Sequence, residues 1–352
     1  MIINKILSLA ASIIKFAIIL LLISNTLAEE NSIKKYYNDN GVLGLMYHRF
    51  DENKYPSTNI RMEVFKKQID IIKQSGFRFI NPDEFSREFD LVKDDKKVLL
   101  TIDDAFSSFY INAWPYLKEN KIPFILFVST KPAGSSGYMS WDQIREIEKE
   151  DFVFIGNHSH SHEYLIDVSF KMFEEDINMS IKKFKKEIGY NPSYFSYPFG
   201  EYSLKQKEFI KKRFKFAFGQ QSGVIDVNKD KFELPRFPIN EKYGDLDRFK
   251  FLVNLKPLEY NNISLKDMYV LKKNNPPELI ISFFENQNNL KNINCFSNEG
   301  GKWNNSNISF INNELKISFS DKFKERRGRV NCSLNDENSW RWLGLQFSIE
   351  SD

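Results

Sequence analysis

Hydrophobic positions between residues 41 and 240 follow two alternating patterns. Short, almost wholly apolar runs such as Val42–Tyr47 and Val98–Ile102 predict buried strands. Between such runs, apolar residues return every three or four positions, as Phe65 and Ile69 do, and this spacing predicts amphipathic helices. Strands that alternate with helices are typical of a parallel α/β sheet, either open or closed into a barrel.

The same patterns predict further elements in this part of the chain. The expected strands are 124–128, 152–155, 194–197, 216–218 and 234–239. The expected helices run through Tyr110 and Leu117, over 141–147, over 170–188 and around Phe209. In such folds the loops at the carboxyl ends of the strands surround the active site, and the polar clusters of this chain fall at those ends.

After about residue 256 the pattern changes to short alternating runs. These runs, at 279–283, 308–311, 315–319 and 343–347, predict a small antiparallel β domain. We therefore expect a main α/β domain over 40–255 and a β-rich domain over 270–352. The only two cysteines, Cys295 and Cys332, lie in the second domain, far along the chain from the other polar clusters, so they are excluded as metal ligands. In an oxidising compartment they are expected to form a disulfide, and two buried free thiols are the alternative.

The N-terminus has the pattern of a signal peptide. Lys15 precedes the apolar stretch Phe16–Ile23, and the small residues Thr26 and Ala28 fit a signal-peptidase site, which makes residues 1–28 the expected leader. The alternative is an uncleaved membrane anchor. Under either interpretation the body of the protein lies outside the cytoplasm, periplasmic or secreted.

Composition narrows the class of partner. The 352 residues are 41% hydrophobic and 28% charged, which is ordinary for a globular protein, and 33 Phe indicate an aromatic-rich core. A formal net charge of +3 argues against nucleic acid as the main partner. A short lysine run over 182–186 is interpreted as the wet face of a helix, while peripheral association with an anionic membrane or polymer surface stays open.

Three of the four histidines lie in the stretch 158–162, directly after an expected strand. His158 and His162 are four positions apart, so on a helical turn they would face the same side. Neutral imidazoles at this spacing suit a divalent transition metal. The alternative is a solvated, histidine-rich loop.

Asp103 and Asp104 end a strand that is otherwise almost wholly apolar. Adjacent carboxylates at a strand end point in different directions, so one suits metal binding and the other proton transfer; a turn or helix cap is the alternative. One Asp with two His supplies three ligands and leaves a position for water, the open pattern of a catalytic zinc site. Zinc is therefore the default metal, and cobalt, nickel and iron are competitors.

Three motifs in order resemble those of the NodB-homology polysaccharide deacetylases, carbohydrate esterase family 4. Thr101–Ala105 resembles the first motif, usually Thr-Phe-Asp-Asp-Gly, and His158–His162 matches the second, His-Ser/Thr-x-x-His. Tyr197–Gly200 resembles the third, and Leu234–Arg236 is similar to the Arg-bearing segment that follows. The resemblance covers roughly Gly41–Asn240 and implies a distorted (β/α) barrel.

The resemblance also implies roles for single residues. Asp103 would be the general base, and the metal ligands would be Asp104, His158 and His162. The backbone N–H of Phe199 would stabilise the oxyanion of the tetrahedral intermediate. The substrate-binding residues would be Tyr197, Pro198 and Arg236. His160, between the two ligands, is expected to point away.

The chain departs from the family pattern at three places. Ala105 replaces the usual Gly, and its methyl group is expected to be tolerated. Phe195 stands where many members carry an Arg that orients the base, and Arg236 is the candidate to replace that Arg. No histidine follows His162, so the late Leu-x-His motif with its catalytic acid is absent.

His48 is the candidate for the missing acid. It lies in Leu45–Phe50, directly after the first strand, and this stretch resembles the opening of a permuted subgroup that includes deacetylases of biofilm poly-N-acetylglucosamine. In that subgroup an early His occupies the place of the acid. A leaving amine needs a proton, and His is well tuned to supply one. The alternative is a strand-end His that hydrogen-bonds locally.

The predicted function is metal-dependent removal of N-acetyl groups from amino sugars of an extracytoplasmic polysaccharide or glycolipid. One alternative keeps the chemistry but changes the group, to an O-acetyl ester on a glycan or a formyl group on a lipid-linked sugar. The other is a noncatalytic glycan-binding protein with a relic site, in which the tryptophans Trp303, Trp340 and Trp342 would stack on sugars. Those tryptophans would otherwise fill the small β core.

Overall fold

The computed structural model describes residues 41–89, 96–285, 287, 289–336 and 339–351. The expected signal peptide, residues 1–28, lies outside this part of the chain. Among the residues that are described, no helix has the length and apolar character needed to cross a bilayer. By their contacts, the described residues all belong to one unit.

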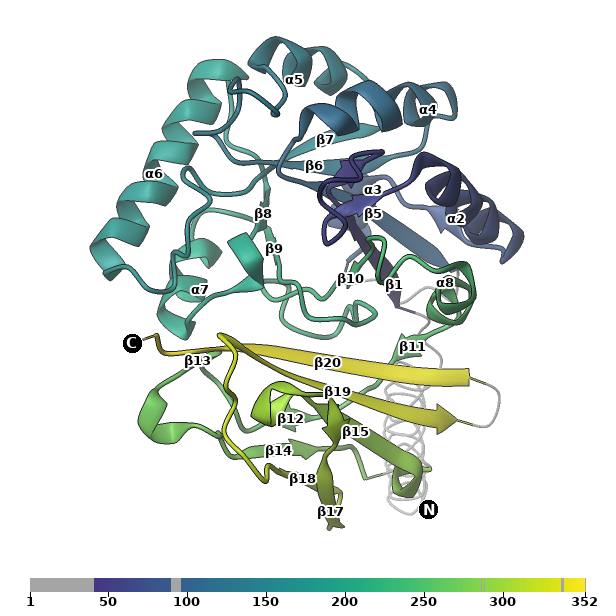
Figure 1. The fold of residues 1–352 in the computed structure, drawn as a ribbon, viewed down its shortest axis with the longest axis vertical. Helices are drawn as coiled ribbons and strands as arrows, with labels where there is room; N and C mark the ends of the chain where they lie inside the picture. The colour runs from purple at the N-terminus through teal and green to yellow at the C-terminus, as the bar shows by residue number, and fades with distance from the viewer. Residues whose placement is uncertain (1–40, 90–95, 286, 288, 337–338, 352) are drawn as a thin grey trace, which may run out of the picture. The chain divides into compact units, whose positions relative to one another are not determined.

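Eight parallel strands form the sheet at the centre of the barrel (Figure 1). Their order is β10-β1-β5-β6-β7-β8-β9, and β4 pairs with the start of β5. The sheet curls into a half-barrel, so the predicted distorted (β/α) barrel is confirmed. The strands are β1 (Val42–Tyr47), β4 (Arg78–Phe79), β5 (Lys97–Asp103), β6 (Phe124–Val128), β7 (Val153–Asn157), β8 (Tyr194–Ser196), β9 (Phe216–Phe218) and β10 (Phe237–Pro238).

Helices lie around the outside of this sheet (Figure 1). Phe65 and Ile69 are fully buried on the first of them, as their spacing predicts. Ser140 and Ser203 begin two others with capping boxes. The helices are α2 (Met62–Gln74), α3 (Pro82–Glu88), α4 (Trp114–Glu119, preceded by a π-helical turn over Phe109–Ala113), α5 (Trp141–Glu148), α6 (Phe170–Glu187), α7 (Leu204–Lys211) and α8 (Leu246–Val253).

The two faces of β5 explain how the sheet serves both core and site. Val98, Leu100 and Ile102 point outward into the main hydrophobic core, and all three are fully buried. Each such side chain contributes about 1.5–3 kcal/mol on burial. Because side chains alternate along a strand, Thr101 and Asp103 point to the opposite, inner face. The apolar alternation therefore fixes which carboxylate faces the interior of the barrel.

Two predictions of secondary structure are wrong in this region. The expected strand 234–239 shortens to β10, because Pro235 and Pro238 cannot donate to a ladder and the Arg236 amide donates instead to the carbonyl of Gln221. Helix α8 was not predicted, although Asp245 caps it by accepting from the amides of Asp247 and Arg248.

The chain after residue 255 is β-rich, as predicted. A six-stranded sheet has the order β11-β20-β19-β15-β16, with β13 also paired to β20, and a four-stranded antiparallel sheet has the order β12-β14-β18-β17. Strands β11 and β13 run parallel to β20, so the region is not purely antiparallel. The boundaries 40–255 and 270–352 stay predictions.

The remaining elements are short or lie in this region. Two bonded pairs of residues make β2 (Arg49–Phe50) and β3 (Asn59–Ile60). The other strands are β11 (Lys256–Pro257), β12 (Asn262–Ile263), β13 (Tyr269–Val270), β14 (Leu279–Ser282), β15 (Ile293–Ser297), β16 (Asn304–Asn305), β17 (Asn307–Ile311), β18 (Glu314–Ser318), β19 (Arg327–Asp336) and β20 (Ser339–Ile349). Single 3₁₀ turns cover Pro198–Gly200, Lys272–Asn274, Leu290–Asn292 and Glu299–Gly301.

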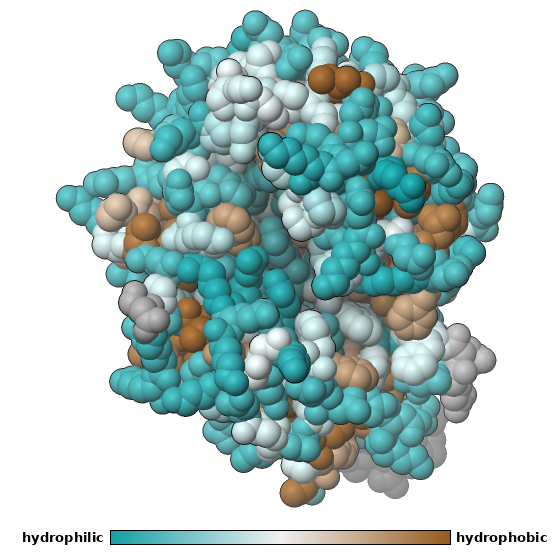
Figure 2. Space-filling view, viewed as in Figure 1, coloured by the Kyte–Doolittle hydropathy of each residue, from teal (hydrophilic) through white to brown (hydrophobic). Residues whose placement is uncertain are grey.

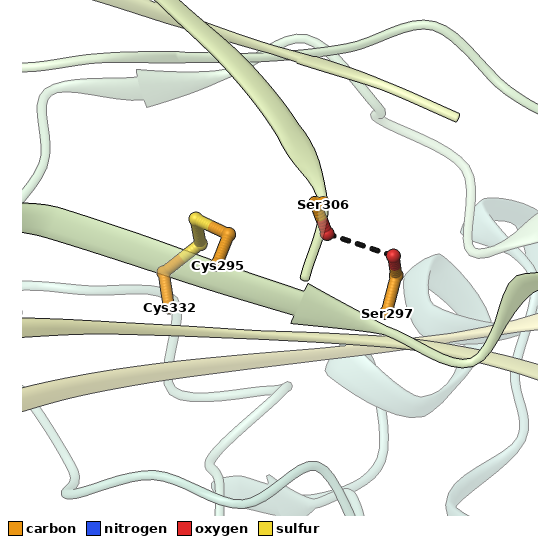
Figure 3. The surroundings of a disulfide bond; sticks show 4 residues. All are labelled: Cys295, Ser297, Ser306 and Cys332. Carbon is orange, nitrogen blue, oxygen red and sulfur yellow. Dashed lines mark hydrogen bonds between the residues drawn. A yellow bond between two sulfur atoms is a disulfide. The ribbon is translucent and has the colours of Figure 1, made fainter. Parts of the chain in front are cut away.

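A disulfide joins the two strands β15 and β19 (Figure 3). Cys295 and Cys332 are direct cross-strand partners and both are buried, so the predicted bond is confirmed. Nearby, the hydroxyls of Ser297 and Ser306 share a hydrogen bond of 2.7 Å. These links hold β15 against the two long strands. The face seen in Figure 2 is mostly hydrophilic, with hydrophobic residues in small scattered groups.

Replacing Cys295 and Cys332 together by alanine is expected to lower the free energy of unfolding by about 3–4 kcal/mol. The bond spans 37 positions, and its loss restores the entropy of that loop in the unfolded chain. Urea unfolding measures the change. As a control, Ser297→Ala with Ser306→Ala should lower it by only about 0.5–1.5 kcal/mol. Equal losses in the two double variants would contradict the expectation.

Candidate active site

A turn with unusual backbone geometry follows β5. Asp104 has φ 75° and Ala105 has φ 55°, both in the left-handed region. An L-residue pays roughly 1–2 kcal/mol there, which explains why a Gly is usual at the position of Ala105. The Ala105 methyl group is fully buried and accommodated, and the Ala105 carbonyl accepts from the amide of Met139. Both carboxylates approach His158 Nε2: Asp104 Oδ1 lies 3.5 Å from it and Asp103 Oδ2 lies 3.9 Å from it.

The histidine loop after β7 is not a helical turn. Ser159 has φ 69° and His162 has φ 57°, which interrupt any helix. The buried carboxylate of Asp176, on α6, accepts two loop amides and holds the chain in this course. The rings of His158 and His162 nevertheless converge, with centroids 4.8 Å apart. The two rings therefore face the same side, although the backbone that carries them is a loop and not a helical turn.

Asp104, His158 and His162 form one cluster. Asp104 Oδ1 lies 3.0 Å from His162 Nε2 and 3.5 Å from His158 Nε2. The three ligand atoms all lie within 4.8 Å of one another. Burial raises the pKa of Asp104, but the nearby His162 outweighs it and the pKa is lowered. Burial lowers the pKa of His162, but Asp104 raises it more, so the net shift is upward.

His158 supplies a test of whether these residues fit a metal. Its Nδ1 lies 2.7 Å from the carbonyl oxygen of Ser196, which can only accept, so Nδ1 carries the proton. Burial lowers the pKa of His158 to about 4, which keeps the ring neutral. Its Nε2 lone pair then faces Asp104 and has no hydrogen-bond partner in the described part of the chain. Two acceptors that face each other in a buried place fit a cation between them, and the donor set suits a divalent one.

Asp103 is held by Arg236 in a buried, two-pronged ion pair. Arg236 Nη1 donates to Asp103 Oδ1 at 2.7 Å, and Nη2 donates to Oδ2 at 2.9 Å. The same guanidinium donates to the hydroxyls of Thr101 and Ser196. Burial raises the pKa of Asp103, but Arg236 and His158 lower it more, so the net shift is downward. Asp103 is therefore ionised at neutral pH.

This position of Arg236 corrects one prediction and supports another. Its side chain is fully buried and does not line the cavity, so the substrate-binding role has no support here. Arg236 instead holds both oxygens of Asp103, the residue predicted to be the base, as expected of a replacement for the Arg that many family members carry at Phe195. Phe195 is itself buried in the α6–α7 core. Gly44 makes room for it, because a Cβ there would lie 3.2 Å from Arg236 Cγ.

Tyr197 and Pro198 are also placed away from any substrate. Tyr197 is 1% exposed, and its hydroxyl donates to the carbonyl of Phe232 at 3.1 Å. Pro198 is buried as well. Neither residue lines the cavity. A motif gives residue types but not side-chain directions, and here both side chains turn into the core.

Phe199 sits in a strained turn beside the ligand cluster. Its φ is 59°, and its ring lies 4.8 Å from His162 and 4.2 Å from Tyr164, centroid to centroid. Its carbonyl accepts from Gln346 Nε2 of β20 at 2.9 Å. The next residue, Gly200, has φ 70°, and a Cβ there would lie 2.5 Å from the amide nitrogen of Gln220. The C-terminal β region thus fixes this turn.

A cavity of about 720 Å³ opens onto the cluster. His48, Asp104, His162 and Phe199 all line it, so the structure brings the early histidine to the same place as the later motifs. His48 is half-buried. His160 does not join them: its Nδ1 lies 2.8 Å from the hydroxyl of Thr130, as its expected outward direction implies.

Sequence reasoning missed the contribution of β19 and β20 to this cavity. Arg327 and Arg329 of β19 and Gln346 of β20 line it, together with Trp303, which directly precedes β16. The two arginines are two positions apart on β19, so they share a face of the strand. That spacing is visible in the sequence, but nothing in it indicates that the face meets the barrel.

Comparisons with known proteins agree with this site. The family model for polysaccharide deacetylase matches residues 91–213. The poly-beta-1,6-N-acetyl-D-glucosamine N-deacetylase of Staphylococcus aureus (strain MSSA476) is 25% identical over 256 residues, which are 64% of this chain and 87% of that protein. Its Staphylococcus epidermidis counterpart is 24% identical, over 65% of this chain and 88% of that one.

Solved structures show the same fold. IcaB from Ammonifex degensii has a TM-score of 0.56 and 25% identity, and the match covers 61% of this chain and 98% of that one. The Streptococcus pyogenes deacetylase PplD in complex with acetate has a TM-score of 0.53 and 22% identity, over 58% and 94% of the two chains. Residues 91–213 of the chain therefore belong to a polysaccharide deacetylase domain, and both the sequence relatives and the solved structures are polysaccharide deacetylases. Among these relatives, the curated sequences reported above are named as poly-β-1,6-N-acetylglucosamine deacetylases.

Arg236→Met is expected to lower the free energy of unfolding by about 3–5 kcal/mol, because it leaves the Asp103 charge buried and unpaired. Adding Asp103→Asn should recover much of that loss, since the uncompensated charge disappears. A double-mutant cycle by denaturant unfolding checks both values. A loss below about 1 kcal/mol in Arg236→Met would show that the Asp103–Arg236 pair contributes little to stability.

Proposed function

We propose that this enzyme is a metal-dependent hydrolase that removes N-acetyl groups from amino sugars of a polysaccharide outside the cytoplasm. The observation that carries the proposal is the orphaned His158 Nε2, which faces Asp104 and His162 at the edge of a large cavity. Asp103 lies beside this cluster with Arg236 fixing its orientation.

Asp104, His158 and His162 would hold the ion. Zinc is the metal we propose, because two imidazoles and one carboxylate are its usual catalytic ligands; cobalt, nickel and iron stay competitors. When bound, such an ion supplies Lewis-acid chemistry, making water a nucleophile near neutral pH and polarising a carbonyl.

Asp103 would accept the proton of the attacking water. Its Oδ2 lies 3.9 Å from His158 Nε2, so the carboxylate borders the ligand cluster. The lowered pKa keeps it ionised and also makes it a weaker base. We therefore assign its effect to position: Arg236 holds both carboxylate oxygens and leaves little freedom to rotate.

His48 would give a proton to the leaving nitrogen, and the Phe199 amide would stabilise the oxyanion. Both residues line the cavity with the ligand cluster, which supports the assignment. The hydrogen bond from Gln346 to the Phe199 carbonyl would keep that turn, and hence its amide, in place during the reaction.

The substrate we propose is a carbohydrate polymer. The relatives of this protein are named for deacetylation of poly-β-1,6-N-acetylglucosamine. This supports an amide-linked acetyl group as the target over an ester or a formyl group. Export by the N-terminal leader is part of the proposal. A sugar-bearing lipid and peripheral membrane association gain no support from any contact in the described residues.

The tryptophans support a glycan substrate to different degrees. Trp303 is 48% exposed and lines the cavity. Trp342 also lines the cavity, but it is half-buried and its indole N–H donates to the Ser222 hydroxyl, while Trp340 packs near Phe251. Trp303 is thus the one best placed to stack on a sugar. A pure binding protein would need neither the ligand cluster nor the Asp103–Arg236 pair.

Acetate release by zinc-loaded protein tests the function. The panel would hold β-1,6- and β-1,4-linked N-acetylglucosamine oligosaccharides, peptidoglycan strands and acetyl-xylan. Release from amino-sugar substrates supports the proposal. Release from acetyl-xylan alone would move the function to an esterase, and no release from any of them would overturn it.

His158→Gln is expected to abolish binding of one zinc ion per chain, because it removes a buried ligand. Metal analysis after dialysis measures the stoichiometry, and zinc-dependent protection against heat gives a second readout. His160→Gln is the matched control, since it changes a histidine of the same loop that bonds Thr130 instead. Unchanged zinc content in His158→Gln would remove the assignment.

His48→Ala should keep the metal and the fold but lower kcat on an amide substrate by roughly 10²–10⁴, the range for losing a positioned proton donor. The loss should shrink on activated aryl acetates, whose leaving group needs no proton. Steady-state kinetics on both substrates decide it. Near-normal turnover of the amide would mean that water or another residue supplies the proton.

A further inference from the structure

Cations line the cavity in numbers that the proposed chemistry does not use. Lys242 and Arg248 come from the segment after β10, and Arg327 and Arg329 come from β19. Among the described residues that line the cavity, Asp104 is the sole carboxylate, and it belongs to the ligand cluster. The cavity wall outside that cluster is therefore positively charged.

Few of these cations have a carboxylate partner. Arg327 lies 3.5 Å from Glu201, but Glu201 is already held by two nitrogens of Arg326. Within the described residues, Lys242, Arg248 and Arg329 form no ion pair with a carboxylate. Arg329 Nε donates to the neutral Gln346 at 3.2 Å.

The two other cations share one aromatic ring. Lys242 Nζ and the Arg248 guanidinium each lie 5.3 Å from the centre of the Tyr243 ring. Arg248 also donates to the Tyr243 carbonyl. An aromatic face and a carbonyl attract cations but leave their net charge uncompensated. The cavity wall thus carries positive charge without a paired carboxylate on both sides.

The positive charge is most concentrated on β19, at Arg327 and Arg329. They stand on one face of the strand, two positions apart, and both are half-buried. Burial is the largest cause of the lowered pKa of Arg329, and Arg327 lowers it further, while Tyr243, Glu325 and Glu201 offset part of the shift. A planar anion with two oxygens would relieve the repulsion, because the guanidinium fork binds carboxylate and phosphate in a bidentate way.

We propose that the substrate is an anionic glycan, with an acidic group near the acetylated sugar that Arg329 and Arg327 bind. Trp303, exposed in the same cavity, would stack on the sugar that carries the acid. This inference rests on the proposed function, since it names the substrate class of that site. A sugar carboxylate and a phosphate substituent share the chemistry, and the test separates them.

The first experiment compares kcat/KM on three matched oligosaccharides of N-acetylglucosamine: neutral, carboxylate-bearing and phosphate-bearing. Wild-type enzyme should prefer at least one acidic substrate by about tenfold at low salt, and the preference should fall as salt is raised. The preferred substrate identifies the acidic group as a carboxylate or a phosphate. A ratio near one for both acids overturns the proposal.

Variants locate the effect. Arg329→Gln should reduce the acidic-to-neutral ratio by roughly fivefold to tenfold, and Lys242→Gln, on the exposed side, by less. Lys242 does not bond Gln346, so it controls for movement of that side chain. Arg87→Gln, an exposed arginine of α3 paired with Asp83, removes one charge elsewhere and should leave the ratio unchanged. Equal ratios in all variants would contradict the assignment to Arg329.

Direct binding separates this inference from the proposed function. Calorimetry with an acidic oligosaccharide that carries no acetyl group measures affinity without turnover. Binding that weakens in Arg329→Gln supports the anion site even if no substrate releases acetate, an outcome that would overturn the proposed function alone. The alternative is that these cations only repel the amine of the deacetylated product. In that case the acidic oligosaccharide would not bind, and deacetylation would be slower on a sugar next to a glucosamine unit. That result would overturn the inference.

Discussion

The ion pair between Asp103 and Arg236 is the interaction on which the rest of the site depends. It joins the end of β5 to the segment before β10 across the barrel interior, with both side chains fully buried. The desolvation cost of burying these two charges is offset because every donor of the guanidinium has an acceptor, including the carbonyl of Gly219. Gly44 on β1 must stay without a side chain to admit it. Asp103 thus has one orientation, with Oδ2 at 3.9 Å from His158 Nε2, while its neighbour Asp104 lies nearer to both histidines of the cluster.

Backbone strain is the second constraint, and it is concentrated in the loops that carry the site. Asp104, Ala105, Ser159, His162 and Phe199 all have positive φ. Such conformations persist only where surrounding contacts over-determine them. Here those contacts come from a distance in sequence: the carboxylate on α6 holds the histidine loop, and the side-chain amide on β20 holds the turn after β8. Ligand geometry is therefore a property of the whole fold.

The sequence predicted what depends on local periodicity and on residue type. The apolar runs gave β5 and its neighbours, and the motifs gave Asp104, His158 and His162, which the fold brings into one cluster. Side-chain direction was beyond reach: the motif suggested both substrate binding and orientation of Asp103 for Arg236, and the structure buries the side chain against Asp103. The histidine spacing suggested a helical turn because sequence separation does not reveal positive φ. The arginines of β19 were passed over because no local pattern shows which strand face meets another region.

The β-rich C-terminal region acts as a wall of the active-site cavity, which changes how the enzyme's selectivity should be understood. Arg329 bonds Gln346, and Gln346 bonds the carbonyl of Phe199, so the cationic wall and the strained turn are two ends of one chain of hydrogen bonds. A group bound at Arg329 would act on a side chain that already holds the catalytic turn. Since the disulfide ties β19 to β15, the arginines are presented by a braced strand rather than a loop. If Arg329 binds an acidic group of the substrate as proposed, selection by charge and the geometry of the Phe199 turn would be coupled through these hydrogen bonds.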